Sequence, residues 1–421
     1  MPHFAKPAAG SWTENYPELG TSPVNYEDSI DPAYYEAEKE AIFKKTWLNV
    51  GRVEQVPKVG SYFTKELAVA DTSLVIVRGK DKEIRAFHNV CRHRGNKLVW
   101  NDYPGEEVKG TCRQFTCKYH AWRYSLDGDL TFVQQEKEFF DLDKADYGLK
   151  LVRCEVWEGF VFVNLDPNAQ PLKEYLGEFA KGLEGYPFHE MTEVFTYKAE
   201  IGSNWKLFID AFAEFYHAPV LHMKQAVKDE ADKLFNVGYE ALHYEIHPPH
   251  SMISSWGGMS PPKDLTIVKP IERVLRSGLF GPWEAPDIEG LDPLPPGLNP
   301  GGHRAWGNDS FEFFPNMTLL IWKPGWYLTY HYWPTAVDKH LFEANLYFVP
   351  AKTARERLKQ ELAAVTFKEY ALQDGNTLEA TQTMLKSRVV TEFPLCDQEL
   401  LLRHLHKTVA DYVKEHTDAA Q

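Results

Sequence analysis

Short apolar runs separated by turn residues dominate the chain from about residue 45 to residue 166. The β-branched run Ser73–Val77 and the run Glu83–Asn89 flank a Gly-Lys-Asp turn, and the same pattern continues through the turn at Leu126–Leu130 and the apolar run Gly159–Asn164. Runs of this length with Gly and Asp between them are typical of strands joined by hairpins. We therefore expect residues 45–166 to form a small all-β domain.

Helical periodicity replaces this strand pattern on both sides of the region. Residues 317–349 again alternate like antiparallel strands, whereas residues 257–303 hold many Pro and Gly and are expected to form irregular loops that wall a substrate site. The expected helices cover residues 32–47, 171–185, 203–217 and 352–386.

These patterns predict an α+β protein in three parts. The segment Asp166–Pro171 has the composition of a linker. We expect an N-terminal segment at 1–44, the all-β domain at 45–166, and an α+β domain with an antiparallel sheet at 167–421. The N-terminal segment should pack on the last domain, so that the all-β domain is an insertion near its start.

Composition narrows the function classes. Hydrophobic residues make up 43% and charged residues 25% of the chain, which is typical of a globular protein in water. The net charge of −14 argues against general binding to nucleic acid or anionic membranes. The apolar runs are too short to span a bilayer and the N-terminus lacks the pattern of a secretion signal, so we expect a cytoplasmic protein.

One region departs from this acidic character. Residues 78–123 carry a net charge of +6, while the rest of the chain carries −20. Such a region is either an ordinary solvated surface or a docking surface for an acidic partner. Arg92 and Lys97 are two of its basic residues.

The five cysteines are an odd number in a chain of this kind, which favours metal binding over a disulfide framework. Two short arms stand out: Cys91-Arg-His93 and Cys117-Lys-Tyr-His120. Four such ligands suit either tetrahedral zinc or a [2Fe–2S] cluster with two histidines on one iron. Because each arm carries one Cys and one His, the cluster is favoured over zinc and over four unrelated buried residues. Cys112, Cys154 and Cys396 are interpreted as small buried apolar residues.

A second group of metal-ligating residue types follows. Asp210, Glu214 and His217 are spaced to share one face of the expected helix, which Pro219 should end soon afterwards, so that a turn can bring His222 back. Two histidines and a carboxylate are the ligands of non-haem Fe(II) oxygenases. The alternative is that the histidines are structural, with their hydrogen bonds satisfied.

Together, these motifs resemble the α subunits of Rieske-type non-haem iron oxygenases, over roughly residues 30–390. The arms resemble the family's C-x-H…C-x₂-H motif, supported by Gly95 and by the sequence from Trp122 to Gly128. Residues 204–222 resemble its mononuclear iron motif. Two departures are a spacer of 23 residues between the arms, with the excess expected in Asn101–Lys109, and Glu214 where the family more often has Asp.

The resemblance implies a role for each site residue. Cys91, His93, Cys117 and His120 would hold the [2Fe–2S] cluster. His217 and His222 would hold Fe(II), with Asp374 as the third ligand and Glu369 and Glu379 as rivals on the same expected helix. Glu214 would accept hydrogen bonds from His217 and from His120, and Asp210 is the other acid of the motif.

The resemblance also implies a Rieske domain within a helix-grip-like catalytic domain, and a terminal oxygenase. Electrons from NADH or NADPH would arrive through a reductase, with or without a ferredoxin, and O₂ would hydroxylate a small organic substrate, aromatic or alicyclic. A homotrimer is implied, with or without a β subunit. Two other functions stay open at this point: an electron carrier whose second site has lapsed, and a zinc-binding structural module.

Overall fold

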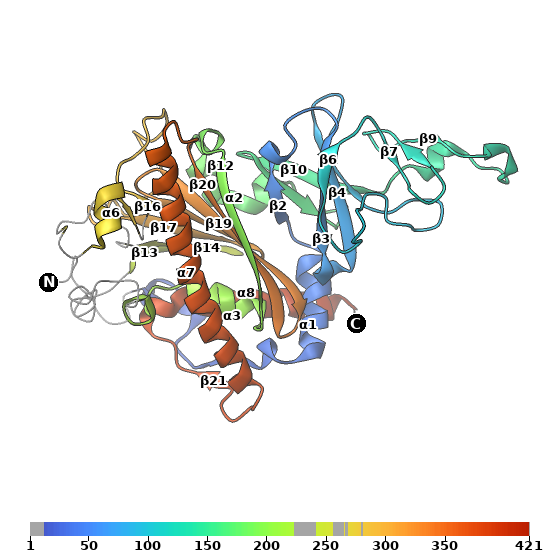
Figure 1. Ribbon diagram of the computed structural model, residues 1–421. Helices are drawn as coiled ribbons and strands as arrows, with labels where there is room; N and C mark the ends of the chain where they lie inside the picture. Colours follow the sequence, from blue (N-terminus) through green and yellow to red (C-terminus); the bar gives the residue numbers. More distant parts are fainter. Residues whose placement is uncertain (1–11, 223–240, 256–264, 266–267, 279–280, 421) are drawn as a thin grey trace. The chain divides into compact units, whose positions relative to one another are not determined.

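The computed structural model describes residues 12–222, 241–255, 265, 268–278 and 281–420 (Figure 1). The chain divides into two compact units. One comprises residues 39–175, and the other comprises the residues before 39 together with those from 176 onward. The helix expected at 32–47 is α1, Pro32–Glu38, continued by a π-helical turn over Lys39–Phe43.

The unit at 39–175 is built from β-strands, as the turn and strand pattern predicts. Its antiparallel seven-stranded sheet has the order β2-β11-β10-β5-β4-β3-β6, and a three-stranded sheet β7-β8-β9 accompanies it. Val75, Phe87, Trp122 and Tyr124 are buried together in its core. The strands are β2 Leu48–Arg52, β3 Ser61–Leu67, β4 Thr72–Arg78, β5 Ile84–His88, β6 Lys109–Thr111, β7 Phe115–Thr116, β8 Arg123–Tyr124, β9 Leu130–Phe132, β10 Leu151–Trp157 and β11 Phe160–Asn164.

The other unit is organised around a second antiparallel sheet of seven strands, in the order β12-β20-β19-β18-β17-β14-β13. Strands were expected at 317–349, and β18, β19 and β20 confirm them. The strands are β12 Glu193–Ile201, β13 Ala241–His247, β14 His250–Ser255, β17 Asn308–Phe313, β18 Met317–Trp322, β19 Trp326–Ala336 and β20 Lys339–Phe348.

Three helices cover one face of this sheet: α3 (Trp205–Phe212), α7 (Ala354–Leu385) and α8 (Leu400–Ala420) (Figure 1). Phe208 of α3 stacks on Phe342 with ring centroids 4.4 Å apart, and Phe367 of α7 packs edge-on against Trp322 and Trp326. These aromatic contacts fix both helices against the strands, so side chains on the inner faces of α3 and α7 meet above the sheet.

The expected helices agree with the structure except at the end of α3. The helices expected at 171–185 and 352–386 are confirmed by α2, Leu172–Leu183, and by α7, although α2 bends at Gly177 with φ +57°. The helix expected at 203–217 is too long, because α3 ends at Phe212. The expected loop region 257–303 is irregular in most of its described part but contains the short helix α6, Pro270–Leu275. Among the described residues, no helix is long and apolar enough to cross a membrane.

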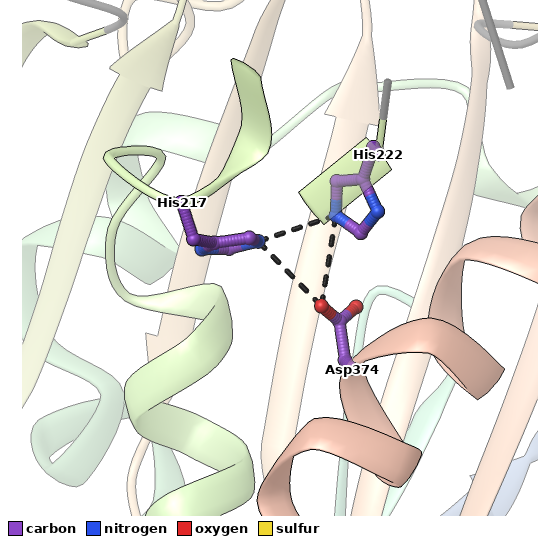
Figure 2. A group of neighbouring side chains, drawn as sticks. All are labelled: His217, His222 and Asp374. Atoms are coloured by element: carbon purple, nitrogen blue, oxygen red, sulfur yellow. Dashed lines mark hydrogen bonds and ion pairs between the residues drawn. The ribbon is translucent and has the colours of Figure 1, made fainter. Parts of the chain in front are cut away.

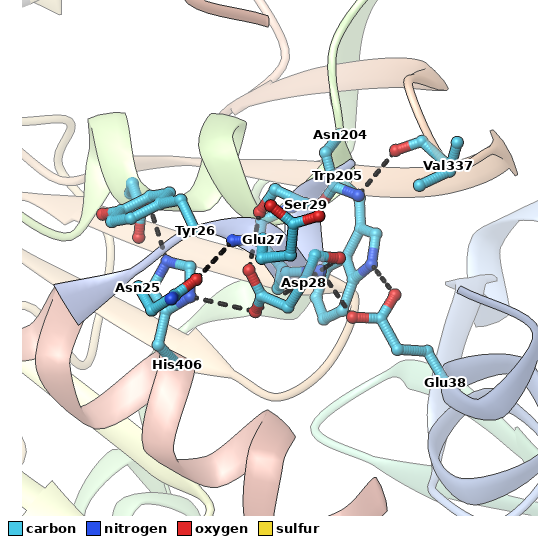
Figure 3. A network of polar contacts seen from close by, with 12 residues as sticks. Asn25, Tyr26, Glu27, Asp28, Ser29, Glu38, Asn204, Trp205, Val337 and His406 are labelled. Carbon is cyan, nitrogen blue, oxygen red and sulfur yellow. Dashed lines mark hydrogen bonds and ion pairs between the residues drawn. The ribbon is translucent and has the colours of Figure 1, made fainter. Parts of the chain in front are cut away.

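A buried network of charged side chains ties the N-terminal segment to α3 and α8 (Figure 3). Lys206 of α3 forms an ion pair with Glu38, whose other oxygen accepts a hydrogen bond from Trp205 at 3.0 Å. His406 of α8 lies between Asp28 and Asp210, with a ring nitrogen 3.2 Å from each carboxylate. Residues distant in sequence thus hold α3 in place.

Candidate metal centres

The short length of α3 changes how its acidic and histidine residues are displayed. Asn204 caps the helix by accepting a hydrogen bond from the Lys206 N–H at 3.0 Å. After Phe212 the chain leaves the helix, and a new short helix, α4 (Ala218–Leu221), starts directly after His217 with Pro219 in its first turn. Proline is favoured there because its missing N–H has no helical partner. The expected single helix face is therefore replaced by a turn between two helices.

This turn and α7 bring three ligand-type side chains together (Figure 2). The Nε2 atoms of His217 and His222 lie 3.2 Å apart, and each lies 3.6 Å from Oδ1 of Asp374. Within the part of the chain that the structure describes, this is the one group of three or more His, Cys, Asp or Glu side chains whose donor atoms all lie within 4.8 Å of one another.

Of the three side chains, Asp374 gives the strongest indication of a bound cation. It is 2% exposed, and neither carboxylate oxygen has a hydrogen-bond partner among the described residues. Its neighbour Gly375 allows α7 to approach β12, since an added Cβ would lie 3.1 Å from Ile201 Cδ1. Burial, with a further contribution from Glu214, raises the pKa of Asp374 to about 7, against the lowering effect of His217. A buried carboxylate with two unpaired oxygens fits a cation.

Each histidine ring is oriented by an acceptor on its other nitrogen. Nδ1 of His217 lies 2.6 Å from Oε1 of Glu214, and Nδ1 of His222 lies 2.8 Å from Oε1 of Gln373. These acceptors favour the tautomer in which Nδ1 carries the proton and Nε2 presents its lone pair. Burial lowers the pKa of His222 to about 4, which keeps its ring neutral. A two-histidine, one-carboxylate metal site fits this arrangement.

The remaining predicted acids are placed elsewhere. Asp210 does not belong to the group; its Oδ2 lies 3.1 Å from the Tyr26 hydroxyl and 3.2 Å from His406 Nε2. Glu379 accepts a hydrogen bond from the Gly202 N–H at 2.9 Å, and neither it nor Glu369 joins the group. Sequence reasoning missed the part played by Gln373, for which its position directly before Asp374 was the available signal.

In the all-β unit, the two Cys/His arms have the same backbone hydrogen bonds. The N–H of Cys91 donates to the carbonyl five residues on, and its own carbonyl accepts from the N–H four residues on; Cys117 does the same. The fourth residue after each cysteine has positive φ, +72° at Gly95 and +59° at Ala121. Glycine adopts this conformation without strain. The arms are thus matched loops.

The donor groups of the arms are arranged as two pairs. Cys91 and Cys117 are each 2% exposed, and Cys117 lies near enough to Cys91 to raise the pKa of its thiol, after the larger effect of burial. The rings of His93 and His120 lie 4.6 Å apart between centroids and are partly exposed. These four side chains do not form a group with all donors within 4.8 Å. One thiol pair and one imidazole pair fit two irons better than a single tetrahedral zinc.

Nearby residues support both pairs. The ring of Trp122 stacks on His93 with centroids 4.8 Å apart and planes 8° from parallel, and the hydroxyl of Tyr124 lies 3.3 Å from Cys91 Sγ. The stretch Asn101–Lys109 is irregular up to the start of β6. Of the other cysteines, Cys112 and Cys154 are only partly buried, and the expectation of a buried Cys396 is wrong, because it is exposed.

Comparison with known families gives two matches. Residues 188–415 match the model described as the ring hydroxylating alpha subunit (catalytic domain), and residues 46–150 match that of the Rieske [2Fe-2S] domain.

Comparison with individual proteins agrees. The chain is 36% identical over 254 residues to the oxygenase subunit of carnitine monooxygenase from Escherichia coli, which covers 59% of this chain and 64% of that protein. It is 37% identical over 246 residues to the hydroxylase subunit alpha of methanesulfonate monooxygenase from Methylosulfonomonas methylovora, covering 53% and 58%. The matched part therefore spans less than two thirds of these relatives.

Solved structures are similar over nearly the whole chain. A quaternary ammonium Rieske monooxygenase in complex with γ-butyrobetaine has a TM-score of 0.70 at 21% identity, covering 93% of this chain and 95% of that chain. Naphthalene 1,2-dioxygenase with bound indole has a TM-score of 0.69 at 20% identity, covering 93% and 92%. At this identity the likeness concerns the fold, and it confirms the predicted fold class.

Proposed function

Because this chain belongs to the family of Rieske oxygenase α subunits, we propose that it is a terminal oxygenase that hydroxylates a small organic substrate with O₂. The observation that carries the proposal is the group His217, His222 and Asp374, with two Nε2 atoms facing a buried carboxylate whose oxygens are both unpaired in the described part of the chain. The family's cofactors are a Rieske [2Fe–2S] cluster and a mononuclear iron.

We assign the cluster to residues 45–166 and the mononuclear iron to residues 167–421, with residues 1–44 packing on the latter domain. Cys91 and Cys117 would hold one iron of the cluster, and His93 and His120 the other. When bound, the cluster supplies single electrons and the ferrous ion supplies a site for O₂.

The chain's own residues would set the geometry of that site. Glu214 accepts a hydrogen bond from Nδ1–H of His217 and also from the backbone N–H groups of Tyr216 and His217, which fix its carboxylate in the turn after α3. In a homotrimer, Glu214 would in addition accept a hydrogen bond from His120 of a neighbouring copy. Asp210, in contact with Tyr26 and His406, would position α3.

The partners follow from the same family membership. We propose that a reductase, with or without a ferredoxin, passes electrons from NADH or NADPH to this chain. The curated relatives are named for substrates as different as carnitine, methanesulfonate and 2-aminobenzenesulfonate, which supports a small organic substrate without limiting it to aromatic rings.

The test uses the purified holoprotein, handled without oxygen. We expect about three irons per chain, two in the cluster and one in the mononuclear site, and after dithionite the electron-spin resonance of an imidazole-ligated cluster. Asp374→Ala should lose about one iron and keep the resonance. The control Glu379→Gln, on the same helix, should keep all three irons and the resonance.

Two results would contradict the proposal. A missing cluster resonance in metal-replete protein favours the zinc-binding module. Two irons per wild-type chain, unchanged in Asp374→Ala, favour the electron carrier with a lapsed second site.

A further inference from the structure

The strand β17 carries a buried carboxylate on the same sheet face as the metal-ligand group. Glu312 of β17 lies opposite Thr318 of β18, and Thr318 lies opposite Tyr330 of β19. Residues directly opposite one another in antiparallel strands share a face of the sheet. Phe212 at the end of α3 packs on Tyr330, with ring centroids 4.6 Å apart, so this is the face that α3 and α7 cover.

A tyrosine lies within electrostatic range of both this carboxylate and Asp374. The hydroxyl of Tyr332 lies 2.6 Å from Thr318 Oγ1, and Thr318 in turn contacts Glu312. Burial raises the pKa of Tyr332 well above its usual range, and the charges of Glu312 and Asp374 raise it further. The Tyr332 hydroxyl is therefore within electrostatic reach of both carboxylates, which lie on the same side of the sheet.

The hydrogen bonds available to Glu312 do not satisfy it. Both of its oxygens lie 2.8 Å from Thr318 Oγ1, which has a single proton and can donate to only one of them. Among the described residues no cationic side chain pairs with Glu312, and burial raises its pKa well above the usual value. Asp309 on the opposite face of β17 differs, because it accepts hydrogen bonds from Ser254 Oγ at 2.5 Å and from the Asn299 N–H at 2.7 Å.

A second polar group beside Glu312 is also left without a partner. Ser310 precedes it by two residues on the same face; it is fully buried, and within the described ranges its hydroxyl makes no hydrogen bond. Glu312 itself retains 8% exposure, so a small part of its side chain remains open to solvent. Buried polar groups in folded proteins are nearly always paired, and exceptions need a reason such as a ligand.

We propose that Glu312, with Ser310 beside it, binds the positively charged alkylammonium group of the substrate. This inference rests on the proposed oxygenase function and names its substrate class. An organic cation supplies the counter-charge that no described residue provides to Glu312. The tyrosine and phenylalanine rings on this face suit the diffuse charge of an alkylated ammonium better than that of a hydrated inorganic ion.

The experiment compares two probes of equal shape on the holoprotein. Choline carries a quaternary ammonium, whereas 3,3-dimethylbutan-1-ol carries the neutral carbon isostere. Calorimetry should show that the wild type prefers choline by about tenfold or more, roughly 1.4 kcal/mol. Glu312→Gln should abolish most of this preference. Glu343→Gln removes a carboxylate that faces the other side of the same sheet, paired with Lys198 at 2.9 Å, and should keep the preference.

The outcomes are distinct. Equal binding of both probes by the wild type, binding of neither, or an undiminished preference in Glu312→Gln each overturns the cation site; Glu312 then has a structural role only. The comparison of the two probes on the wild type remains valid even if Glu312→Gln does not fold. If the iron and resonance measurements succeed while the choline preference is absent, only this inference fails. If the cluster is missing, the oxygenase proposal fails whatever the probes show.

Discussion

The two histidines of the proposed mononuclear site are oriented by chemically different residues. His217 faces the carboxylate of Glu214, whereas His222 faces the neutral amide oxygen of Gln373. Tyr370 also packs edge-on against the His222 ring, with centroids 4.2 Å apart. Orientation by an outer acceptor lowers the entropy lost on metal binding and selects the tautomer that presents Nε2. Gln373 is thus expected to matter for metal affinity although it touches no metal.

Removing this acceptor should weaken metal binding. Gln373→Leu leaves Nδ1 of His222 without its partner, and we expect the affinity for Co(II) or Fe(II) to fall by about 10- to 100-fold. Gln373→Glu keeps an acceptor oxygen and should bind nearly as well as the wild type. Competition with a chelator, followed through the visible spectrum of Co(II), measures this without any turnover. Equal affinities in the wild type and Gln373→Leu would show that Tyr370 and the backbone alone orient the ring.

At the scale of elements, buried charges hold α3 between the N-terminal segment and α8. Burial alone would lower the pKa of His406, but the carboxylates of Asp210 and Asp28 raise it to about 10. Asp28 is affected in the opposite direction: burial would raise its pKa, but Lys206 and His406 lower it to about 2. Breaking such a network from one side leaves a charge buried without its partner, which is strongly destabilising.

The stability of the protein should therefore depend on His406 in a pH-dependent way. Since its folded pKa of about 10 exceeds the unfolded value of 6.5, its contribution is complete below about pH 6.5 and disappears as the pH rises through 10. We expect His406→Gln to lower the free energy of unfolding by about 3 kcal/mol or more at pH 6, and by much less at pH 10.

Denaturant unfolding at the two pH values measures this difference. His416→Gln, further along α8, serves as the control and should show no comparable change with pH. A penalty for His406→Gln that is the same at pH 6 and pH 10 would mean that the residue contributes through packing and not through its charge.

At the scale of the whole molecule, the basic stretch 78–123 is less uniform than its sequence implies. Lys97 pairs with Glu66 at 2.6 Å, and Arg92 donates to the carbonyl of Gly148 at 2.8 Å. Arg94, in contrast, is exposed and lies 5.3 Å from the ring centroid of Tyr119, next to His120. A docking surface for an acidic electron donor would therefore centre on Arg94, and charge reversal at Arg92 or Lys97 would also disturb internal contacts.

The role of Arg94 in docking an electron donor can be tested kinetically. Arg94→Glu should slow reduction of the cluster by the natural donor about tenfold at low ionic strength, and the rate should depend less on salt. Arg273→Glu, an exposed residue of α6 in the other unit, should leave the rate unchanged. Stopped-flow absorbance measures the rate, and dithionite reduction controls for an intact cluster. Identical kinetics in both variants would exclude Arg94 from the docking surface.

Local patterns along the chain were sufficient to predict much of the fold and part of the candidate metal centres. The strands of the all-β unit, the long helix α7 and the two Cys/His arms depend on residues close together in sequence, whose periodicity, turns and spacing can be read directly. The proximity of His217 and His222 could also be predicted from the sequence, because a separation of five residues limits how far apart they can lie.

Contacts between distant residues could not be read in this way. Periodicity alone extended α3 to residue 217, whereas its end at Phe212 and the start of α4 allow His217 to face Asp374 of α7. Asp374 could be chosen over Glu369 and Glu379 only by resemblance, and the choice depends on which turn of α7 packs against β12. Nothing in the sequence distinguishes Glu312 from other residues of a strand. Its position became clear only from the register of three strands and from the absence of a cationic partner among the described residues. Packing across the sheet sets these positions, because a side chain's neighbours there come from segments that no sequence window contains.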